Sequence, residues 1–244
     1  MLSVNIGFNK INFLCIDSTA EGPFISFAGS YPLSKIEDLD TFVSNVLLKD
    51  KALLDSINDN LVLSVDTDYL FFNQKFILDE AHSEYSQGLS NSLSLGEFYD
   101  SYYYPIGSIE NQYLGVHINK EIKDKIIKSF SSVGNIGTLG VGLFSAELGA
   151  SKLFGASKES SYMVMKFKMN NYLELLFVDD GLLSSFSKFR FNVKKNKFEN
   201  KFFLGDQDHY LNIESLLYNL SSSSNTQSNF NCKQFIYQSS GKSK

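Results

Sequence analysis

The stretch VNIGFNKINFLCI, residues 4–16, decides the fold prediction because it reads as two apolar strands joined by a tight turn. We expect strands at Leu2–Phe8 and Ile11–Asp17, since the Asn-Lys pair between them suits a short hairpin turn. A third apolar run, Phe24–Ala28, follows a Glu-Gly-Pro break. The chain is therefore predicted to open with a meander of three strands.

Beyond this meander, helical and strand patterns alternate. Apolar residues from Ile36 to Ile57 recur with a helical period, and the run Leu61–Val65 predicts a strand after them. Tyr113–Ile118 predicts a further strand, and Lys120–Phe130 predicts an amphipathic helix. Residues 69–110 show no clear period and leave room for an inserted subdomain.

The stretch YMVMKFKMNNYLELLFVDDGLL, residues 162–183, predicts a second meander with Asn-Asn and Asp-Asp-Gly turn signals. Its three strands are expected at Tyr162–Met169, Tyr172–Val178 and Leu182–Phe191. A helix at Ile213–Leu220 and a strand at Gln234–Tyr237 repeat the earlier order of elements. The expected fold is therefore α/β, with two mixed sheets flanked by helices.

Composition excludes several classes of protein. The chain has 244 residues, 43 % of them apolar, so it can bury a core. A net charge of −5 and a single arginine, Arg190, argue against a nucleic-acid-binding protein, which needs clustered cations. The N-terminus lacks the pattern of a signal peptide, and no run reaches the ~18 apolar residues of a membrane helix. We therefore expect a cytoplasmic protein without an integral membrane segment.

The doubled order, a meander followed by alternating helices and strands, resembles the duplicated ribonuclease-H-like halves of the actin-like ATPase superfamily. Within it, the similarity is to the PilM-type and GspL-type cytoplasmic domains of pilus assembly and type II secretion. The hairpin at 4–16 stands where that family has a strand–turn–strand phosphate loop, and 162–183 resembles the corresponding hairpin of the second half. The resemblance implies a first half at residues 1–135, with the inserted subdomain within 69–110, and a second, shortened half at 136–244.

The chain departs from the residues that ATP-binding members of that family use. Such members have an acidic residue two positions before a glycine; here Gly7 is kept, and Asn5 replaces the acid. In the second hairpin, residues 167–169 (Phe-Lys-Met) stand where an Asp-x-Gly is expected, and bulky side chains block close approach of the backbone to phosphate. We therefore predict a vestigial nucleotide site at Asn5, Gly7 and Asp66 and no bound cofactor. Binding of ATP and Mg²⁺ stays open as the weaker alternative.

Other polar clusters give no catalytic site. Asp66 and Asp68 follow a predicted strand and could bind a divalent cation, but turn capping explains them equally well, so no metal site is predicted. The glycine-rich run 137–142 lacks a clear strand before it and is expected to be a connector rather than a dinucleotide loop, although Gly137–Leu153 could hold a short strand followed by a helix. The cluster at 206–209 has no nucleophile beside it, and we predict no catalytic residue.

Basic residues concentrate at one place on this acidic chain. They are expected to span a strand end and the loop after it: Lys188, Arg190, Lys194, Lys195 and Lys197. A solvated loop explains such a run, and so does a surface that binds an acidic partner or an anionic membrane. We predict these residues as the partner-binding surface. The tyrosine-rich run 98–104 fits core or subdomain contacts, and exposed tyrosines there would favour protein binding.

Together these observations favour a non-catalytic actin-like scaffold, a pseudo-ATPase, that binds a membrane-anchored protein in a pilus or secretion-type assembly. Such a protein would be cytoplasmic and could associate peripherally with the inner membrane. Two alternatives stay open: an ATP-binding actin-like enzyme, and an intracellular α/β protein outside this superfamily.

Overall fold

The computed structural model describes residues 2–51, 54, 61–76, 95–107, 111–145, 147, 161–168, 171–205, 210, 213, 215, 217–218 and 233–238. The chain divides into two compact units that alternate along the sequence. Unit 1 comprises Met1–Phe71, Ser90–Ser101 and His117–Ser145, and unit 2 comprises Phe72–Leu89, Tyr102–Val116 and Ala146–Lys244. The predicted division into halves at 1–135 and 136–244 stays a prediction.

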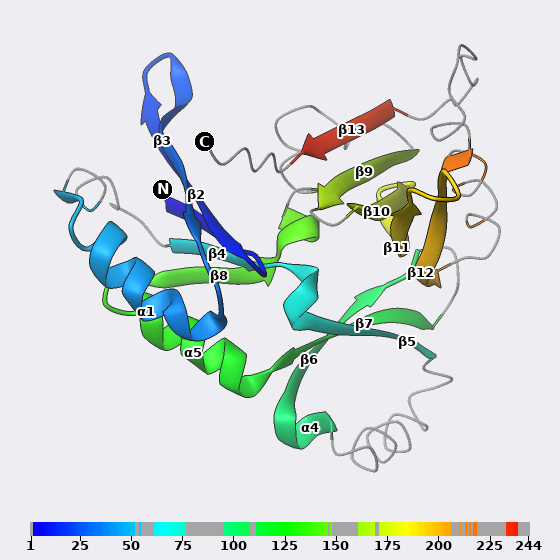
Figure 1. The fold of residues 1–244 in the computed structure, drawn as a ribbon, viewed down its shortest axis with the longest axis horizontal. Helices are drawn as coiled ribbons and strands as arrows, with labels where there is room; N and C mark the ends of the chain where they lie inside the picture. The colour runs from blue at the N-terminus through cyan, green and yellow to red at the C-terminus, as the bar shows by residue number, and fades with distance from the viewer. Residues whose placement is uncertain are drawn as a thin grey trace. The chain divides into compact units, whose positions relative to one another are not determined.

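Sheet 1 belongs to unit 1 and has the strand order β3-β2-β1-β4-β8 (Figure 1). The opening meander is confirmed, and its strands are longer than predicted: β1 (Leu2–Ile6), β2 (Lys10–Thr19) and β3 (Gly22–Pro32). Two parallel strands, β4 (Leu61–Val65) and β8 (Ile136–Val141), then extend the sheet beyond β1. The run 137–142 therefore lies largely in a strand, and its prediction as a connector is wrong.

Helices cover one face of sheet 1 because alternate residues of its strands are apolar. The first helical segment consists of the 3-10 turn η1 (Ile36–Asp38), α1 (Leu39–Phe42) and the π-helical turn η2 (Val43–Leu47). The end of the helix predicted to Ile57 lies outside the described residues. α5 (Lys120–Phe130) has its predicted bounds, and the Asn119 side chain caps it by accepting hydrogen bonds from two backbone N–H groups.

Phe42 occupies the centre of this core. Its ring centroid lies 5.6 Å from that of Phe13, 5.3 Å from that of Tyr31 and 6.3 Å from that of Phe130. The contacts join β2, β3 and α5 to α1, and Phe42 itself is fully buried. Aromatic side chains from four elements therefore pack together in the core of unit 1.

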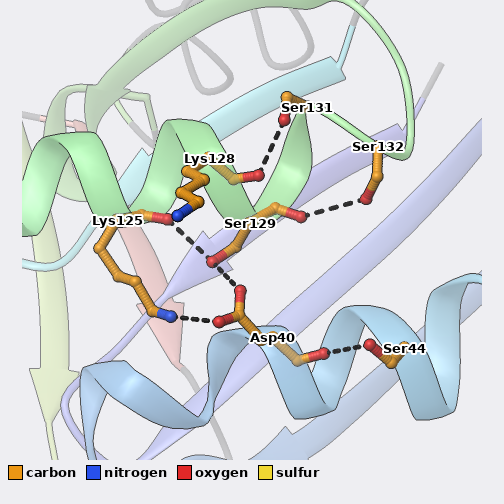
Figure 2. Close-up of polar contacts among 7 residues, drawn as sticks. All are labelled: Asp40, Ser44, Lys125, Lys128, Ser129, Ser131 and Ser132. Carbon is orange, nitrogen blue, oxygen red and sulfur yellow. Dashed lines mark hydrogen bonds and ion pairs between the residues drawn. The ribbon is translucent and has the colours of Figure 1, made fainter.

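A polar contact also links α1 to α5 (Figure 2). The Asp40 carboxylate accepts hydrogen bonds from Lys125 Nζ and from Ser129 Oγ, the second at 2.7 Å. The Lys125 bond, followed by the Ser129 bond, lowers the pKa of Asp40 from its ordinary value. The contact links the two helices at the surface of the unit.

Sheet 2 belongs to unit 2 and has the order β12-β11-β10-β9-β13. The predicted second meander is confirmed as β9 (Ser161–Lys168), β10 (Tyr172–Asp179) and β11 (Leu182–Asn192). β13 (Lys233–Gln238) pairs parallel to β9, as the element order requires. β12 (Lys197–Gly205) was not predicted, because its lysines and asparagine resemble a loop.

One face of sheet 2 forms a separate core. Its buried members come from β9, β10, β11 and the helical residues near 213: Met163, Met165, Leu173, Leu175, Phe189, Ile213 and Leu217. The described residues between 210 and 218 are helical, which agrees with the predicted helix in this region. Each unit therefore has its own hydrophobic core.

A third sheet forms from the region that gave no clear sequence pattern. Its order is β5-β7-β6, with β5 at Leu70–Phe76, β6 at Tyr99–Pro105 and β7 at Gln112–Asn119, and α4 (Leu95–Phe98) precedes β6. β6 escaped prediction because residues 101–105 are all exposed, so apolar and polar residues do not alternate along it. Among the described residues, no helix is long and apolar enough to cross a membrane.

Candidate functional site

The strand ends of β1 and β4 bring the predicted nucleotide-site residues together in unit 1. These strands are parallel neighbours, and Asn5 is paired with Ser64 in their register. Asn5 Nδ2 donates a hydrogen bond of 2.8 Å to Ser64 Oγ. Gly7 and Asp66 follow directly where the two strands end, at the edge where ligands gather in open α/β sheets.

Gly7 is needed here by the hairpin itself. Its N–H donates a 2.9 Å hydrogen bond to the Lys10 carbonyl oxygen, and a Cβ at this position would lie 2.9 Å from the same oxygen. Any side chain would therefore push against the backbone of the turn. The geometry of the turn therefore explains the glycine at position 7 without a bound phosphate.

Asp66 acts as a cap in this structure. The residue is buried, and its Oδ1 accepts a 2.8 Å hydrogen bond from the Thr67 N–H at the start of η3 (Thr67–Tyr69). Its other oxygen lies beside Gly7, 3.6 Å from the position of a Cβ there. The capping interpretation of Asp66 therefore has a direct structural basis.

Tyr69, the last residue of η3, also contacts this edge. Its hydroxyl donates a 3.4 Å hydrogen bond to the Gly7 carbonyl oxygen. Burial raises the pKa of Tyr69 to about 12, and the negative charges of Asp68 and Asp66 add to the rise. The phenol therefore keeps its proton and remains a donor to the hairpin.

These residues fit poorly with the ATP and Mg²⁺ that the resemblance implies for active members. Asn5 presents a carboxamide whose nitrogen is engaged with Ser64, and one oxygen of Asp66 already caps η3. In the part of the chain that the structure describes, no three His, Cys, Asp or Glu residues form a group that could hold a metal ion. Loss of nucleotide binding stays a prediction.

The hairpin of β9 and β10 also lacks the residues expected of a phosphate loop. Phe167 is 37 % exposed near its end, and Met169 lies outside the described residues. Lys168 is engaged within the sheet, because its Nζ donates a 3.1 Å hydrogen bond to Glu174 Oε1. The turn continues through Asn171, whose φ of 62° is in the left-handed region that asparagine tolerates.

Glu174 is the centre of a row of charges on β9, β10 and β11. It is fully buried, and its neighbours in the register are Lys166 on β9 and Lys188 on β11. Its Oε1 lies 3.1 Å from Lys168 Nζ and 3.6 Å from Lys188 Nζ. No sequence pattern revealed this row, because its members become neighbours only through the register of three strands.

The predicted partner-binding residues lie on a β-hairpin rather than on a strand end and loop. Lys188 and Arg190 belong to β11, Lys194 and Lys195 to the turn, and Lys197 to β12. Lys188 Nζ and Arg190 Cζ lie 5.2 Å and 5.6 Å from the ring centroid of Tyr172. The prediction of a loop is wrong because the residues from Lys197 onward form strand β12.

Glu199 on β12 engages part of this basic surface. Its carboxylate accepts hydrogen bonds from Asn192 and Lys195, at 2.8 Å and 3.1 Å, and pairs with Lys201 at 3.5 Å. The Asn192 bond, followed by the Lys195 bond, lowers the pKa of Glu199 to about 2. Arg190, Lys194 and Lys197 are exposed, and within the described residues none of them forms an ion pair with a carboxylate.

The two five-stranded sheets share the arrangement of four strands. In each, the first strand of a three-stranded meander also pairs parallel to a later strand, β4 in sheet 1 and β13 in sheet 2. The fifth strands differ, since β8 pairs parallel to β4 in sheet 1 and β12 pairs antiparallel to β11 in sheet 2. A chain of the PilM–PilN type IV pilus biogenesis complex is similar to this structure, with a TM-score of 0.54 and 11 % identity over 80 % of this chain. The chain has an actin-like ATPase fold.

This actin-like chain spans 62 % of that chain of the PilM–PilN complex. The cytoplasmic domain of EpsL from the type II secretion system of Vibrio cholerae matches 97 % of this chain and 82 % of its own, with a TM-score of 0.46 and 10 % identity. A Bacteroides thetaiotaomicron protein with an actin-like ATPase fold matches 89 % and 74 %, with a TM-score of 0.45 and 12 % identity. No protein-family model matches the sequence, and no curated protein gives a significant match.

The resemblance predicted from the two hairpins is thus confirmed at the level of the fold. The second sheet ends at β13, without a strand corresponding to β8 of the first sheet among the described residues. The polar cluster at 206–209 lies outside the described residues, so the prediction that it forms no catalytic site stays a prediction.

Proposed function

We propose that this chain is a non-catalytic actin-like scaffold that binds a membrane-anchored protein in a pilus or secretion-type assembly. The observation that carries the proposal is Asn5, whose carboxamide is hydrogen-bonded to Ser64 where the resembled ATPases have a metal-binding acid. The similar fold in the PilM–PilN complex supports a role in assembly, because that complex takes part in pilus biogenesis.

The basic hairpin of β11 and β12 is the proposed contact for the partner. Arg190, Lys194 and Lys197 are exposed there, while Lys195 is engaged by Glu199. An acidic segment of the partner would complement these cations, and mutation of such charges at the edge of an interface changes the association rate and its salt dependence. The protein would act on the cytoplasmic side of the membrane, and no nucleic acid is expected as a partner.

A sedimentation assay tests this role. The purified chain is mixed with inner-membrane vesicles of its own host, with the same vesicles stripped by protease, and with protein-free vesicles containing anionic lipid. We expect binding to the intact vesicles only, and a severalfold loss for the variant Arg190→Glu/Lys194→Glu/Lys197→Glu. Lys51→Glu, an exposed lysine of unit 1, is the matched control and should bind normally.

The outcomes separate the candidate functions. Binding that survives protease treatment, or equal binding to protein-free vesicles, would contradict a protein partner and indicate attraction to lipid. Absence of binding to intact vesicles would contradict the scaffold role. Release of bound protein by Mg-ATP, with nucleotide turnover, would favour the actin-like enzyme.

A further inference from the structure

Arg190 is the only arginine of the chain, and its side chain lies over an aromatic ring on sheet 2. Its neighbour in the register is Tyr172 of β10, and its Cζ lies 5.6 Å from the centroid of the Tyr172 ring. Lys188, two residues earlier on β11, places its Nζ 5.2 Å from the same centroid. A cation over an aromatic face is attracted by the ring quadrupole, so Tyr172 restricts where these two charges lie.

The carboxylates on neighbouring positions of the sheet are engaged by other cations. Glu174 pairs with Lys188, whose Nζ lies 3.6 Å from Glu174 Oε1. Glu199 stands opposite Arg190 in the register of β11 and β12, yet its Oε1 lies 3.1 Å from Lys195 Nζ. Across the described part of the chain, the exposed Arg190 forms no ion pair, so its guanidinium is available to a ligand.

An arginine in this position differs in chemistry from the lysines of the same hairpin. A guanidinium is planar and donates two parallel hydrogen bonds to one carboxylate, whereas a lysine ammonium is a strongly hydrated point charge. The exposed Lys194 and Lys197 therefore supply attraction over a distance, which salt screens. Among the cations of the basic hairpin, Arg190 alone can recognise the shape of a carboxylate.

We infer that Arg190, positioned by the ring of Tyr172, binds a carboxylate of the partner through two parallel hydrogen bonds. Lys188 adds a second positive charge at the same ring, which makes the place more favourable for an anion. This inference rests on the proposed function, because it names the chemistry by which the basic hairpin would bind its acidic partner. Tyr172 is a positioning residue, and Arg190 determines specificity.

Nuclear magnetic resonance of the nitrogen-15-labelled chain tests the arrangement, because a single arginine gives one side-chain Nε–Hε signal. We expect the Tyr172 ring to shift this proton upfield. Tyr172→Phe should keep the shift, since phenylalanine presents the same kind of ring face, whereas Tyr172→Leu should abolish it. A signal at the same position in the parent and in both variants would overturn the role of Tyr172.

Titration with an acetylated oligoglutamate peptide tests the carboxylate chemistry in the same spectrum. The Arg190 signal should move and saturate with this peptide, and the corresponding oligoglutamine peptide should leave it unmoved. An Arg190 signal that does not respond to oligoglutamate, or that responds equally to oligoglutamine, would overturn the inference whether or not the chain binds membranes.

Sedimentation with the host's inner-membrane vesicles tests the inference with the partner itself. Arg190→Lys keeps the charge and removes the second hydrogen bond, so we expect roughly tenfold weaker binding, the equivalent of one charge-assisted hydrogen bond. Lys51→Arg, at an exposed lysine of unit 1, is the matched control and should bind like the parent. Conversion of the vesicle proteins' carboxylates to amides with a carbodiimide and ethanolamine should abolish binding.

The outcomes distinguish this inference from the proposed function. Normal binding of Arg190→Lys, together with weak binding of Arg190→Glu/Lys194→Glu/Lys197→Glu, would overturn the inference and leave the proposed function standing. Binding that survives amidation of the vesicle proteins would also overturn it, because the partner group would then not be a carboxylate. No binding of the parent to intact vesicles would contradict the proposed function, and the oligoglutamate titration would then decide on Arg190 by itself.

Discussion

Replacement of Glu174 by glutamine is expected to destabilise unit 2 selectively. Glutamine keeps the shape of the side chain but removes its charge, while Lys166, Lys168 and Lys188 remain on the neighbouring positions of β9 and β11. Glu174 is 0 % exposed and the Lys168 side chain is 9 % exposed, so water cannot replace the lost counter-charge efficiently. The perturbation therefore removes the buried carboxylate that pairs with Lys168 and Lys188.

The expected magnitude follows from this burial. Removing one partner of a buried ion pair costs ~3–5 kcal/mol, because the other charge stays uncompensated. The glutamine oxygen can still accept a hydrogen bond from Lys168, which lies 3.1 Å away, so we expect the lower end of that range. At ~2–4 °C per kcal/mol for a chain of this size, the thermal midpoint of unit 2 should fall by roughly 6–12 °C.

Glu199→Gln is the matched control, because Glu199 also bridges two lysines but its side chain is 26 % exposed instead of buried. Hydrogen-exchange mass spectrometry during urea unfolding separates the two units, since it reports on peptides of β9–β11 and of α5 independently. We expect Glu174→Gln to lose protection in β9–β11 and to keep it in α5, whereas Glu199→Gln stays close to the parent. Equal protection of β9–β11 in all three proteins would refute the argument from buried charge.

Three further predictions concern unit 1. Gly7→Ala should destabilise it by ~1–3 kcal/mol in urea titrations, because the added Cβ would lie 2.9 Å from the Lys10 oxygen; an unchanged midpoint would contradict this. Phe42→Ala should cost ~3–5 kcal/mol through loss of the aromatic core, and a smaller loss would show that the site can collapse. The pKa of Tyr69 is about 12 in the folded protein and about 10 in the unfolded chain, so the unfolded chain ionises first as the pH rises. The free energy of unfolding should therefore fall between about pH 10 and about pH 12, and Tyr69→Phe should lack this part of the fall in urea titrations.

The sequence was informative where a strand buries one face and stays polar on the other. The first strand of the hairpin at 4–16 has this alternation, whereas the strands at 162–183 are continuous buried runs marked by the turn residues between them, and both meanders formed as predicted. Lys120–Phe130 was equally readable because a helical apolar stripe coincides with an asparagine cap. These local signals, in their order along the chain, were sufficient to indicate the actin-like fold.

Strands without alternation could not be found in this way. β6 is exposed from residue 101 to 105, and β12 contains lysines and an asparagine typical of loops, so their strand structure depends on pairing with neighbours. The row around Glu174 was also hidden, because its members meet only once the register of three strands is fixed. The same holds for Asp66, whose capping bond requires the turn after β4.

The measurement that tests the central claim most directly is thermal unfolding of the chain with and without millimolar Mg-ATP, with an active actin-like ATPase as the positive control. A ligand at 100 times its dissociation constant stabilises a protein by ~2.7 kcal/mol. For a chain of this size, that corresponds to roughly 5–11 °C. We predict no shift, because Asn5 and Asp66 are engaged within the protein. A clear upward shift that disappears on mutation of Asp66 would contradict the non-catalytic scaffold and establish a working nucleotide site.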